Sequence, residues 1–299
     1  MTSLRRNTVD LHTHTARSDG VLEPLELYEQ MRAWGSTLVA ITDHDTLAGV
    51  REMLAAGCGA PGTTGPRLIV GVEINTMVDA EVEAVGGTEE RLSELHILGL
   101  GMDPDDATLS ETLERQRGAR ERRLRRTLER LRELGMPVDE HLPQVEGGID
   151  ALGRPHVARA LVSAGHAEDV QDAFARYLVP GKPAYVRRQG IGRRAAIEAI
   201  ITAGGIASLA HASWAADEPE VIDELMRWGL GALEVHYHHW DEERIERMGA
   251  FADDRGLLHT GGSDYHGDTE TYAESQSAVF VPPIAGERLL TALGSVIEL

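Results

Sequence analysis

Short apolar runs alternate with amphipathic patterns towards both ends of the chain. A first strand is predicted to end within 10–14, and six further runs predict buried strands, at 38–41, 68–72, 96–98, 205–210, 232–235 and 257–258. Helical patterns accompany these runs at 24–34, 219–228 and 241–255. Strand–helix alternation of this kind predicts an α/β fold with a parallel sheet or barrel.

The middle of the chain is helical instead. A long pattern rich in Arg and Glu runs from Leu109 to Leu134 and stops at a Gly-Met-Pro sequence, as helices commonly do. Two shorter helical patterns follow, at 155–164 and 167–177. We therefore expect a helical insertion domain at 106–194, between the two halves of a barrel domain at 1–105 and 195–299.

Histidines and carboxylates collect where the predicted strands end. His12 and His14 share one face of the first strand, because side chains alternate along a strand. Glu73 lies inside an apolar strand, where a buried carboxylate needs a partner or an ion. The others near strand ends are Asp19, His44, His96, His211, His236, Asp264 and His266. The ends of parallel barrel strands meet at one face, so the pattern predicts a metal cluster there. Imidazole and carboxylate without sulfur favour Mn²⁺, Fe²⁺ or Zn²⁺.

The composition narrows the function class. The 299 residues carry a net charge of −20, which argues against a stable complex with nucleic acid or an anionic membrane. Glutamates interrupt the arginines of 109–134, so that helix is interpreted as a solvated face and not as an RNA-binding one. No apolar stretch approaches the ~18 residues of a membrane span, and a single cysteine, Cys58, fits a reducing compartment. We expect a cytoplasmic protein; its oligomeric state stays open.

Six motifs together resemble those of the polymerase-and-histidinol-phosphatase (PHP) superfamily of metal-dependent phosphoesterases. They are DLHTHTARSDG, ITDHDT, GVEI, ELHILGL, LAHA and TGGSDYHG. The segment beginning GRPHVARALVSAG resembles the subgroup with a helical insertion. The resemblance implies a distorted (β/α)7 TIM-like barrel that holds two to three divalent metal ions at the C-terminal strand ends.

The resemblance also implies a ligand set. The first ion is held by His12, His14, Glu73 and Asp264. Glu73 bridges to a second ion that is held also by His96 and His211. The third ion is held by Asp19, His44 and His266. A hydroxide that bridges two such ions is a strong nucleophile towards phosphorus. Three divalent ions, the three carboxylates and this hydroxide together leave a local charge of about +2 that attracts a phosphate.

Further residues are candidates for contact with the substrate. Arg154 and His156 begin a predicted helix, where backbone N–H groups favour anions. Lys182 is the only lysine of the chain and is a candidate phosphate ligand. Glu73 and His236 are the candidate catalytic residues. His236 is expected either to protonate the leaving group or to be a hydrogen-bonded residue in the wall of the substrate site. His238 and His239 receive no role.

The predicted function is removal of phosphate from a small phosphomonoester, and the predicted substrate is a nucleotide such as a nucleoside 3′,5′-bisphosphate or AMP. The alternatives are a histidinol-phosphate phosphatase and a 5′–3′ exonuclease that acts on short 5′-phosphorylated oligonucleotides. An amidohydrolase commonly uses a carboxylated lysine on a strand, and the only lysine here lies outside the predicted strands. A non-catalytic scaffold predicts an eroded ligand set, which the chain does not have.

Overall fold

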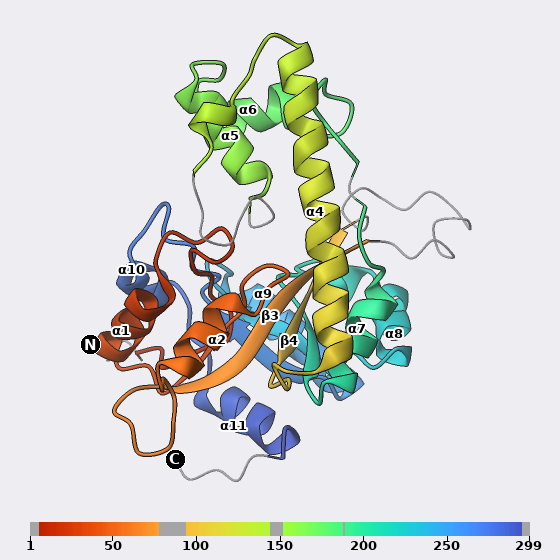
Figure 1. Cartoon of the computed structure of the whole chain (residues 1–299). Coiled ribbons are helices and arrows are strands. Elements are labelled where there is room, and N and C mark those ends of the chain that lie inside the picture. The colour runs from red at the N-terminus through yellow and green to blue at the C-terminus, as the bar shows by residue number, and fades with distance from the viewer. Residues whose placement is uncertain (1–5, 78–93, 144–151, 188, 295–299) are drawn as a thin grey trace.

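The computed structural model describes residues 6–77, 94–143, 152–187 and 189–294. Within these residues seven strands form one sheet in sequence order (Figure 1). The strands are β1 (Val9–Asp10), β2 (Leu38–Ile41), β3 (Arg67–Met77), β4 (Glu94–Leu100), β5 (Ile206–Leu209), β6 (Ala232–Tyr237) and β7 (Leu258–Gly262). The helices are α1 (Pro24–Trp34), α2 (Ala48–Ala55), α4 (Ala107–Glu133), α5 (Arg154–Ser163), α6 (Val170–Ala173), α7 (Arg193–Thr202), α8 (Pro219–Arg227), α9 (Glu242–Arg255), α10 (Tyr272–Ser277) and α11 (Pro283–Ala292).

The sheet is nearly closed into a barrel. Backbone hydrogen bonds join the segment after β1 to β7 and to the segment that follows β7. They run from the Leu11 N–H to the Gly261 carbonyl and from the Asp264 N–H to the His12 carbonyl. This confirms the predicted α/β fold, a distorted TIM-like barrel. The expectation of a purely parallel sheet is wrong, because β4 runs antiparallel to both β3 and β5. A short apolar run carries no signal for strand direction, so the reversal is not visible in the sequence.

Two apolar layers hold the barrel together. One lies between the strands and the surrounding helices and includes Leu27 of α1, Ile197 of α7 and Met248 of α9. The other includes Leu11 and Leu98 together with Leu289 of α11. In Figure 1, α11 lies at the opposite end of the sheet from α5 and α6. The other end of the barrel is therefore the one available for a site.

Helix α4 belongs to two apolar clusters. Leu109 and Leu113 in its first half join the layer around the barrel. Leu124 and Leu128 in its second half pack with a separate cluster that includes Leu161 of α5. Figure 1 shows α4 extending away from the sheet, with α5 and α6 at its far end. The division of the chain at 106–194 remains a prediction, and this separate cluster supports it.

Element boundaries follow the sequence where the apolar pattern is strongest. The predicted bounds of α1 and β2 agree with the structure residue for residue. The helix predicted at 167–177 begins at Val170 instead and is α-helical only as far as Ala173, after which a π-helical turn continues from Phe174 to Leu178. None of the helices in the described part of the chain is long and apolar enough to cross a membrane.

Candidate metal centre

The nine predicted ligands converge at one edge of the barrel. They come from the segments around six strands: His12, His14 and Asp19 after β1, His44 after β2, Glu73 in β3, His96 in β4, His211 after β5, and Asp264 and His266 after β7. The reversal of β4 brings its beginning to the edge where the other strands end. The structure therefore brings together all nine residues.

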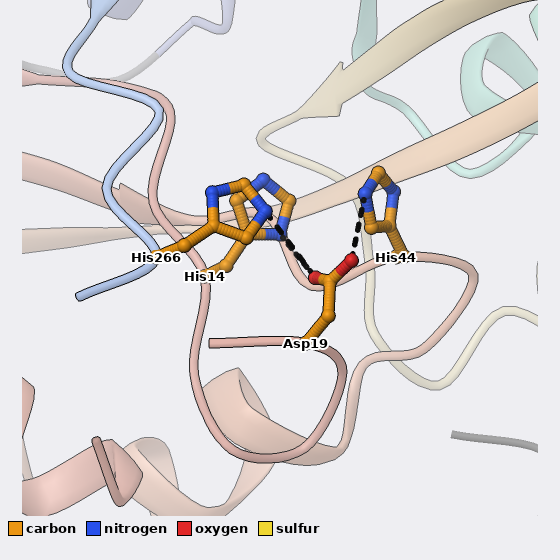
Figure 2. Close-up of side chains that lie close together, drawn as sticks. All are labelled: His14, Asp19, His44 and His266. Carbon is orange, nitrogen blue, oxygen red and sulfur yellow. Dashed lines mark ion pairs between the residues drawn. The ribbon is translucent and has the colours of Figure 1, made fainter. Parts of the chain in front are cut away.

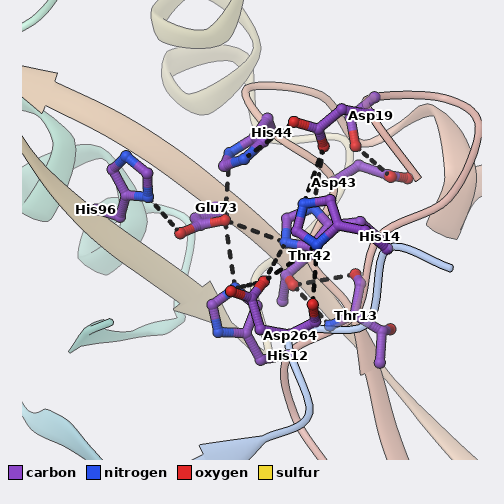
Figure 3. A network of polar contacts seen from close by, with 12 residues as sticks. His12, Thr13, His14, Asp19, Thr42, Asp43, His44, Glu73, His96 and Asp264 are labelled. Atoms are coloured by element: carbon purple, nitrogen blue, oxygen red, sulfur yellow. Dashed lines mark hydrogen bonds and ion pairs between the residues drawn. The ribbon is translucent and has the colours of Figure 1, made fainter. Parts of the chain in front are cut away.

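Glu73 is the centre of this cluster, with only 1% of its surface exposed. Its Oε2 lies 3.3 Å from His12 Nε2 and 3.2 Å from His14 Nε2, and equally 3.2 Å from His44 Nδ1. Its Oε1 lies 2.7 Å from His96 Nδ1 and 3.2 Å from His211 Nε2. One carboxylate therefore faces five imidazole rings, as a group that bridges two ions would. Figure 3 shows Glu73 with the rings of His12, His14, His44 and His96.

Two aspartates complete the cluster on either side. Asp264 Oδ1 lies 3.2 Å from His12 Nε2 and 3.1 Å from His14 Nε2. Asp19 lies 3.3 Å from His266 Nε2 and 3.6 Å from His44 Nε2 (Figure 2). Among the described residues, possible ligand atoms lie within 4.8 Å of one another in three groups here. The groups are His12, His14, Glu73 and Asp264; His14, Asp19, His44 and His266; and His44, Glu73 and His96.

Unpaired buried atoms show that the donor set fits metal ions. His12 Nε2, both ring nitrogens of His14 and Asp19 Oδ1 are buried and make no hydrogen bond in the described part of the chain. Buried polar atoms ordinarily have a partner. A divalent ion bound between imidazole and carboxylate would satisfy these atoms together.

The electrostatics point the same way. Burial alone would raise the pKa of Glu73, but His44, His96 and His12 hold that pKa well below its usual value. The carboxylates of Asp19 and Asp264 are also held at a low pKa by neighbouring imidazoles, against the effect of burial. Burial lowers the pKa of His44 to about 3, so this ring is neutral at pH 7. Charged carboxylates and a neutral His44 are the protonation states that metal binding requires. Against the effect of burial, neighbouring carboxylates raise the pKa of His12, of His14 and, to about 10, of His266, so an ion would displace protons from these three rings.

The comparison with known proteins decides the family. A family model described as the PHP domain matches residues 10–178. The chain belongs to the PHP family. It is 30% identical over 290 residues to the 3′,5′-nucleoside bisphosphate phosphatase of Chromobacterium violaceum, covering 92% of this chain and 93% of that protein. As a PHP protein it is a metal-dependent phosphoesterase, which makes it a hydrolase of phosphate esters.

Two other similarities cover most of the PHP chain. It is 32% identical over 266 residues to a 5′–3′ exoribonuclease of Haemophilus influenzae, covering 86% of this chain and 89% of that one. The solved structure of an amidohydrolase from Chromobacterium violaceum, with bound sulfate and no metal, superposes with a TM-score of 0.79 at 28% identity. That match covers 95% of this chain and 96% of the other.

Two residues that the sequence analysis did not select support the PHP cluster, the buried Glu234 and the partly buried Tyr237. Glu234 is fully buried; it accepts a hydrogen bond from His12 Nδ1 at 2.9 Å and another from the His211 backbone N–H at 2.6 Å. The Tyr237 hydroxyl donates to Asp264 Oδ2 at 2.8 Å. Burial and the Asp264 charge raise the pKa of Tyr237, so the phenol stays a donor. A carboxylate behind a histidine ligand fixes the ring and its tautomer.

Replacing Glu234 with glutamine is expected to lower metal affinity by about 10- to 100-fold, the usual cost of losing such a partner. The amide has one acceptor oxygen, whereas Glu234 accepts on both oxygens. When phosphate release is measured against metal concentration, the concentration that gives half-maximal activity should rise, and the rate at saturating metal should equal that of the parent protein. Glu220→Gln, on the exposed face of α8, is the matched control. If Glu234→Gln needs the same metal concentration as the parent protein, Glu234 does not support the metal cluster.

His236, predicted as a catalytic candidate, faces away from the cluster. Alternation from Glu234 would put it on the cluster side, but a bulge between Glu234 and His236 in the pairing with β7 shifts the register by one residue. Tyr237 takes the cluster side instead. The His236 ring lies 6.0 Å from that of His259 and lines a separate cavity with Trp34 and Trp240. This geometry supports neither interpretation, because His236 lines a cavity apart from the cluster.

The three predicted substrate contacts differ in their placement. His156 is buried at the start of α5, and its Nδ1 accepts from the Gly153 N–H at 3.0 Å, which leaves Nε2 as a donor. Burial lowers the pKa of His156 to about 4, and Asp19 is close enough to act on it. Arg154 lies over the Phe174 ring at 5.9 Å, on the side of α6.

Lys182 is exposed and stands apart from the cluster. Tyr185, three residues later, accepts a hydrogen bond from Arg130. Arg130 is ten residues beyond Arg120 on α4, or about 15 Å along the helix axis. Of the three predicted contacts, His156 has an electrostatic interaction with the cluster through Asp19, whereas the roles of Arg154 and Lys182 stay predictions.

Arginines that the sequence analysis placed on a solvated face lie at the site. Arg120 donates to Asp45 Oδ2 at 3.0 Å, next to the His44 ligand. Arg117, one turn earlier on α4, lines a cavity of about 340 Å³ together with His44, Arg17 and Arg51. Glutamates alternate with arginines along α4, so the composition of the helix conceals that its arginines occupy two different faces. A helical period that sets Arg117 and Arg120 beside the buried Leu113 was the available signal.

Proposed function

We propose that this PHP phosphoesterase removes phosphate from a small nucleotide that carries two phosphate groups, such as a nucleoside 3′,5′-bisphosphate. The observation that carries the proposal is the arginine-lined cavity beside His44 (Arg17, Arg51 and Arg117). It offers a second place for an anion next to the metal centre. A substrate with one phosphate at the centre and one in this cavity would use both.

The nine clustered residues are proposed to hold two to three divalent ions, with Glu73 shared between two of them. When bound, such ions supply Lewis acidity and an activated water for attack on phosphorus. Their identity is proposed as Mn²⁺, Fe²⁺ or Zn²⁺, from the imidazole and carboxylate donors. Because Asp19, Glu73 and Asp264 are negatively charged, the same site without ions would repel a phosphate.

The protein's own groups would orient the substrate and the ligands. Glu234 holds the His12 ring, and Tyr237 holds Asp264 by its hydroxyl. His156 Nε2–H is proposed as a neutral donor to a phosphate oxygen on the α5 side. A neutral donor suits this position because its charge does not change at neutral pH. The substrate roles predicted for Arg154 and Lys182 receive no support from their placement.

The cavity beside His44 suits a phosphate better than a neutral group. Three arginines and one glutamate, Glu114, are its charged members besides His44. A positive excess here is notable in a chain of net charge −20. Arg17 is held by Glu52 at 2.8 Å and Glu23 at 2.9 Å, which fixes its guanidinium at the edge of the cavity. Guanidinium groups fixed in this way are typical phosphate ligands.

A phosphate-release panel with added Mn²⁺ tests the proposed substrate class. It contains a nucleoside 3′,5′-bisphosphate, AMP, a short 5′-phosphorylated oligonucleotide and histidinol phosphate. We expect the bisphosphate to give the highest kcat/KM. A higher value for histidinol phosphate or for the oligonucleotide would contradict the proposal and favour the corresponding alternative. The similarity to the exoribonuclease makes the oligonucleotide the second candidate.

Arg117→Met is expected to raise the KM for the bisphosphate about tenfold, the equivalent of about 1.4 kcal/mol. The KM for AMP should stay within about twofold, because AMP has no second phosphate to place in the cavity. Arg126→Met is the control, since Arg126 is exposed on the same helix and pairs with Glu129 at 3.8 Å. An equal rise in KM for both substrates would show that Arg117 does not read the second phosphate.

A further inference from the structure

The segment that follows β6 has two adjacent histidines to which the proposed function gives no role. β6 ends at Tyr237, and His238 and His239 come next. Glu270 belongs to a different segment, between β7 and α10. The fold brings these two segments side by side, so that possible ligand atoms of His238, His239 and Glu270 all lie within 4.8 Å of one another.

The local backbone turns both imidazoles to the same side. Consecutive side chains of an extended segment point in opposite directions. His239 instead has a φ of 59°, in the left-handed region that is uncommon for a residue with a side chain. The two rings consequently lie 4.5 Å apart between their centroids. The His239 N–H donates to the Ala278 carbonyl at 3.3 Å, which fixes this turn.

One ring nitrogen of this group is buried without a hydrogen bond. His238 Nδ1 is inaccessible to solvent and makes no hydrogen bond among the described residues. A buried ring nitrogen in this condition costs free energy unless a proton donor or a metal satisfies it. His239 is exposed and Glu270 is partly exposed, so an ion can reach the group from solvent.

We propose that His238, His239 and Glu270 form a further binding site for one divalent transition-metal ion, separate from the cluster around Glu73. Two imidazoles and one carboxylate, with the remaining positions open to water, are a donor set that zinc accepts. The two nitrogen ligands favour Zn²⁺ over Mg²⁺ or Ca²⁺, which take oxygen ligands. With three protein ligands and access from solvent, the site binds more weakly than the buried cluster.

This site is connected to the main cluster through one side chain. The Tyr237 ring lies 4.6 Å from the His238 ring, and its hydroxyl bonds to Asp264. An ion at His238 would therefore join the segments after β6 and β7. His238 is the residue next to Tyr237, which holds Asp264 of the main cluster. The proposal concerns ion binding alone and does not depend on the substrate proposed above.

Equilibrium dialysis of the full chain against a series of free Zn²⁺ concentrations tests the proposal, with zinc per chain measured by elemental analysis. The variants are His239→Asn and Glu270→Gln, each of which removes one ligand. The control is His141→Asn, an exposed histidine whose Nδ1 pairs with Ser163 at 3.0 Å on the helical insertion. Phosphate release with Mn²⁺ within about twofold of the parent protein shows that each variant is folded and that the main cluster is intact.

We expect the parent chain and His141→Asn to bind one zinc ion more than either ligand variant, or to bind the last ion at least about tenfold more tightly. Coincident zinc isotherms for all four proteins would overturn the proposal. A loss in only one of the two ligand variants would also overturn it, because the site requires all three ligands. If the protein releases phosphate from no substrate of the panel, the proposed function is contradicted. The number of zinc ions bound per chain still tests the site at His238, His239 and Glu270.

Discussion

Replacing Glu73 with glutamine is expected to lower kcat for phosphate release by at least about 10³-fold, because a group that holds two catalytic ions is lost. The carboxylate lies within 3.3 Å of five imidazole rings and is charged at neutral pH. A glutamine has the same size but no charge. Its NH₂ group would face ring nitrogens and ions where an acceptor oxygen is needed.

The measurement is the initial rate of phosphate release from AMP and from a 3′,5′-bisphosphate at saturating Mn²⁺. Glu111→Gln, an exposed glutamate near the start of α4, is the matched control and should keep the rate of the parent chain. Metal content measured on the same samples should fall for Glu73→Gln alone. A rate within tenfold of the parent protein would contradict the bridging role of Glu73.

Removal of the ions by a chelator is expected to have the other large effect. Without ions, Asp19, Glu73 and Asp264 place three negative charges where the phosphate should bind, because each has a lowered pKa. Dialysis against a chelator should therefore lower phosphate release by at least about 10³-fold, and added Mn²⁺ should restore it. The assay needs a parallel sample that is dialysed without chelator. Full activity in protein shown to be free of metal would contradict a metal-dependent site.

The positions of most cluster residues could be predicted from the sequence for a simple reason. A buried glutamate such as Glu73 is conspicuous in an apolar strand, and pairs such as His12 and His14 share a face by alternation. A barrel then gathers strand ends at one edge whatever the helices between them do. His96 was found by the same argument although β4 runs in the opposite direction, because a reversed strand brings its beginning to that edge.

The remaining features depend on local geometry that composition and periodicity do not reveal. Its place at a strand end selected His236, but one bulge in β6 transferred the contact to Tyr237. Glu234 became a supporting residue because His12 and His211 meet behind the strand, which requires the closed barrel. The sequence did not reveal which face of α4 lies towards the site, because exposed arginines and glutamates surround Arg117 and Arg120 in the sequence.

The central claim is that the nine clustered residues hold at least two metal ions in the active protein. Elemental analysis tests it most directly, on fully active chain that has been dialysed against metal-free buffer so that weakly held ions are removed. The account predicts two to three transition-metal ions per chain in that sample. Fewer than two ions per chain, at undiminished phosphate release, would contradict it.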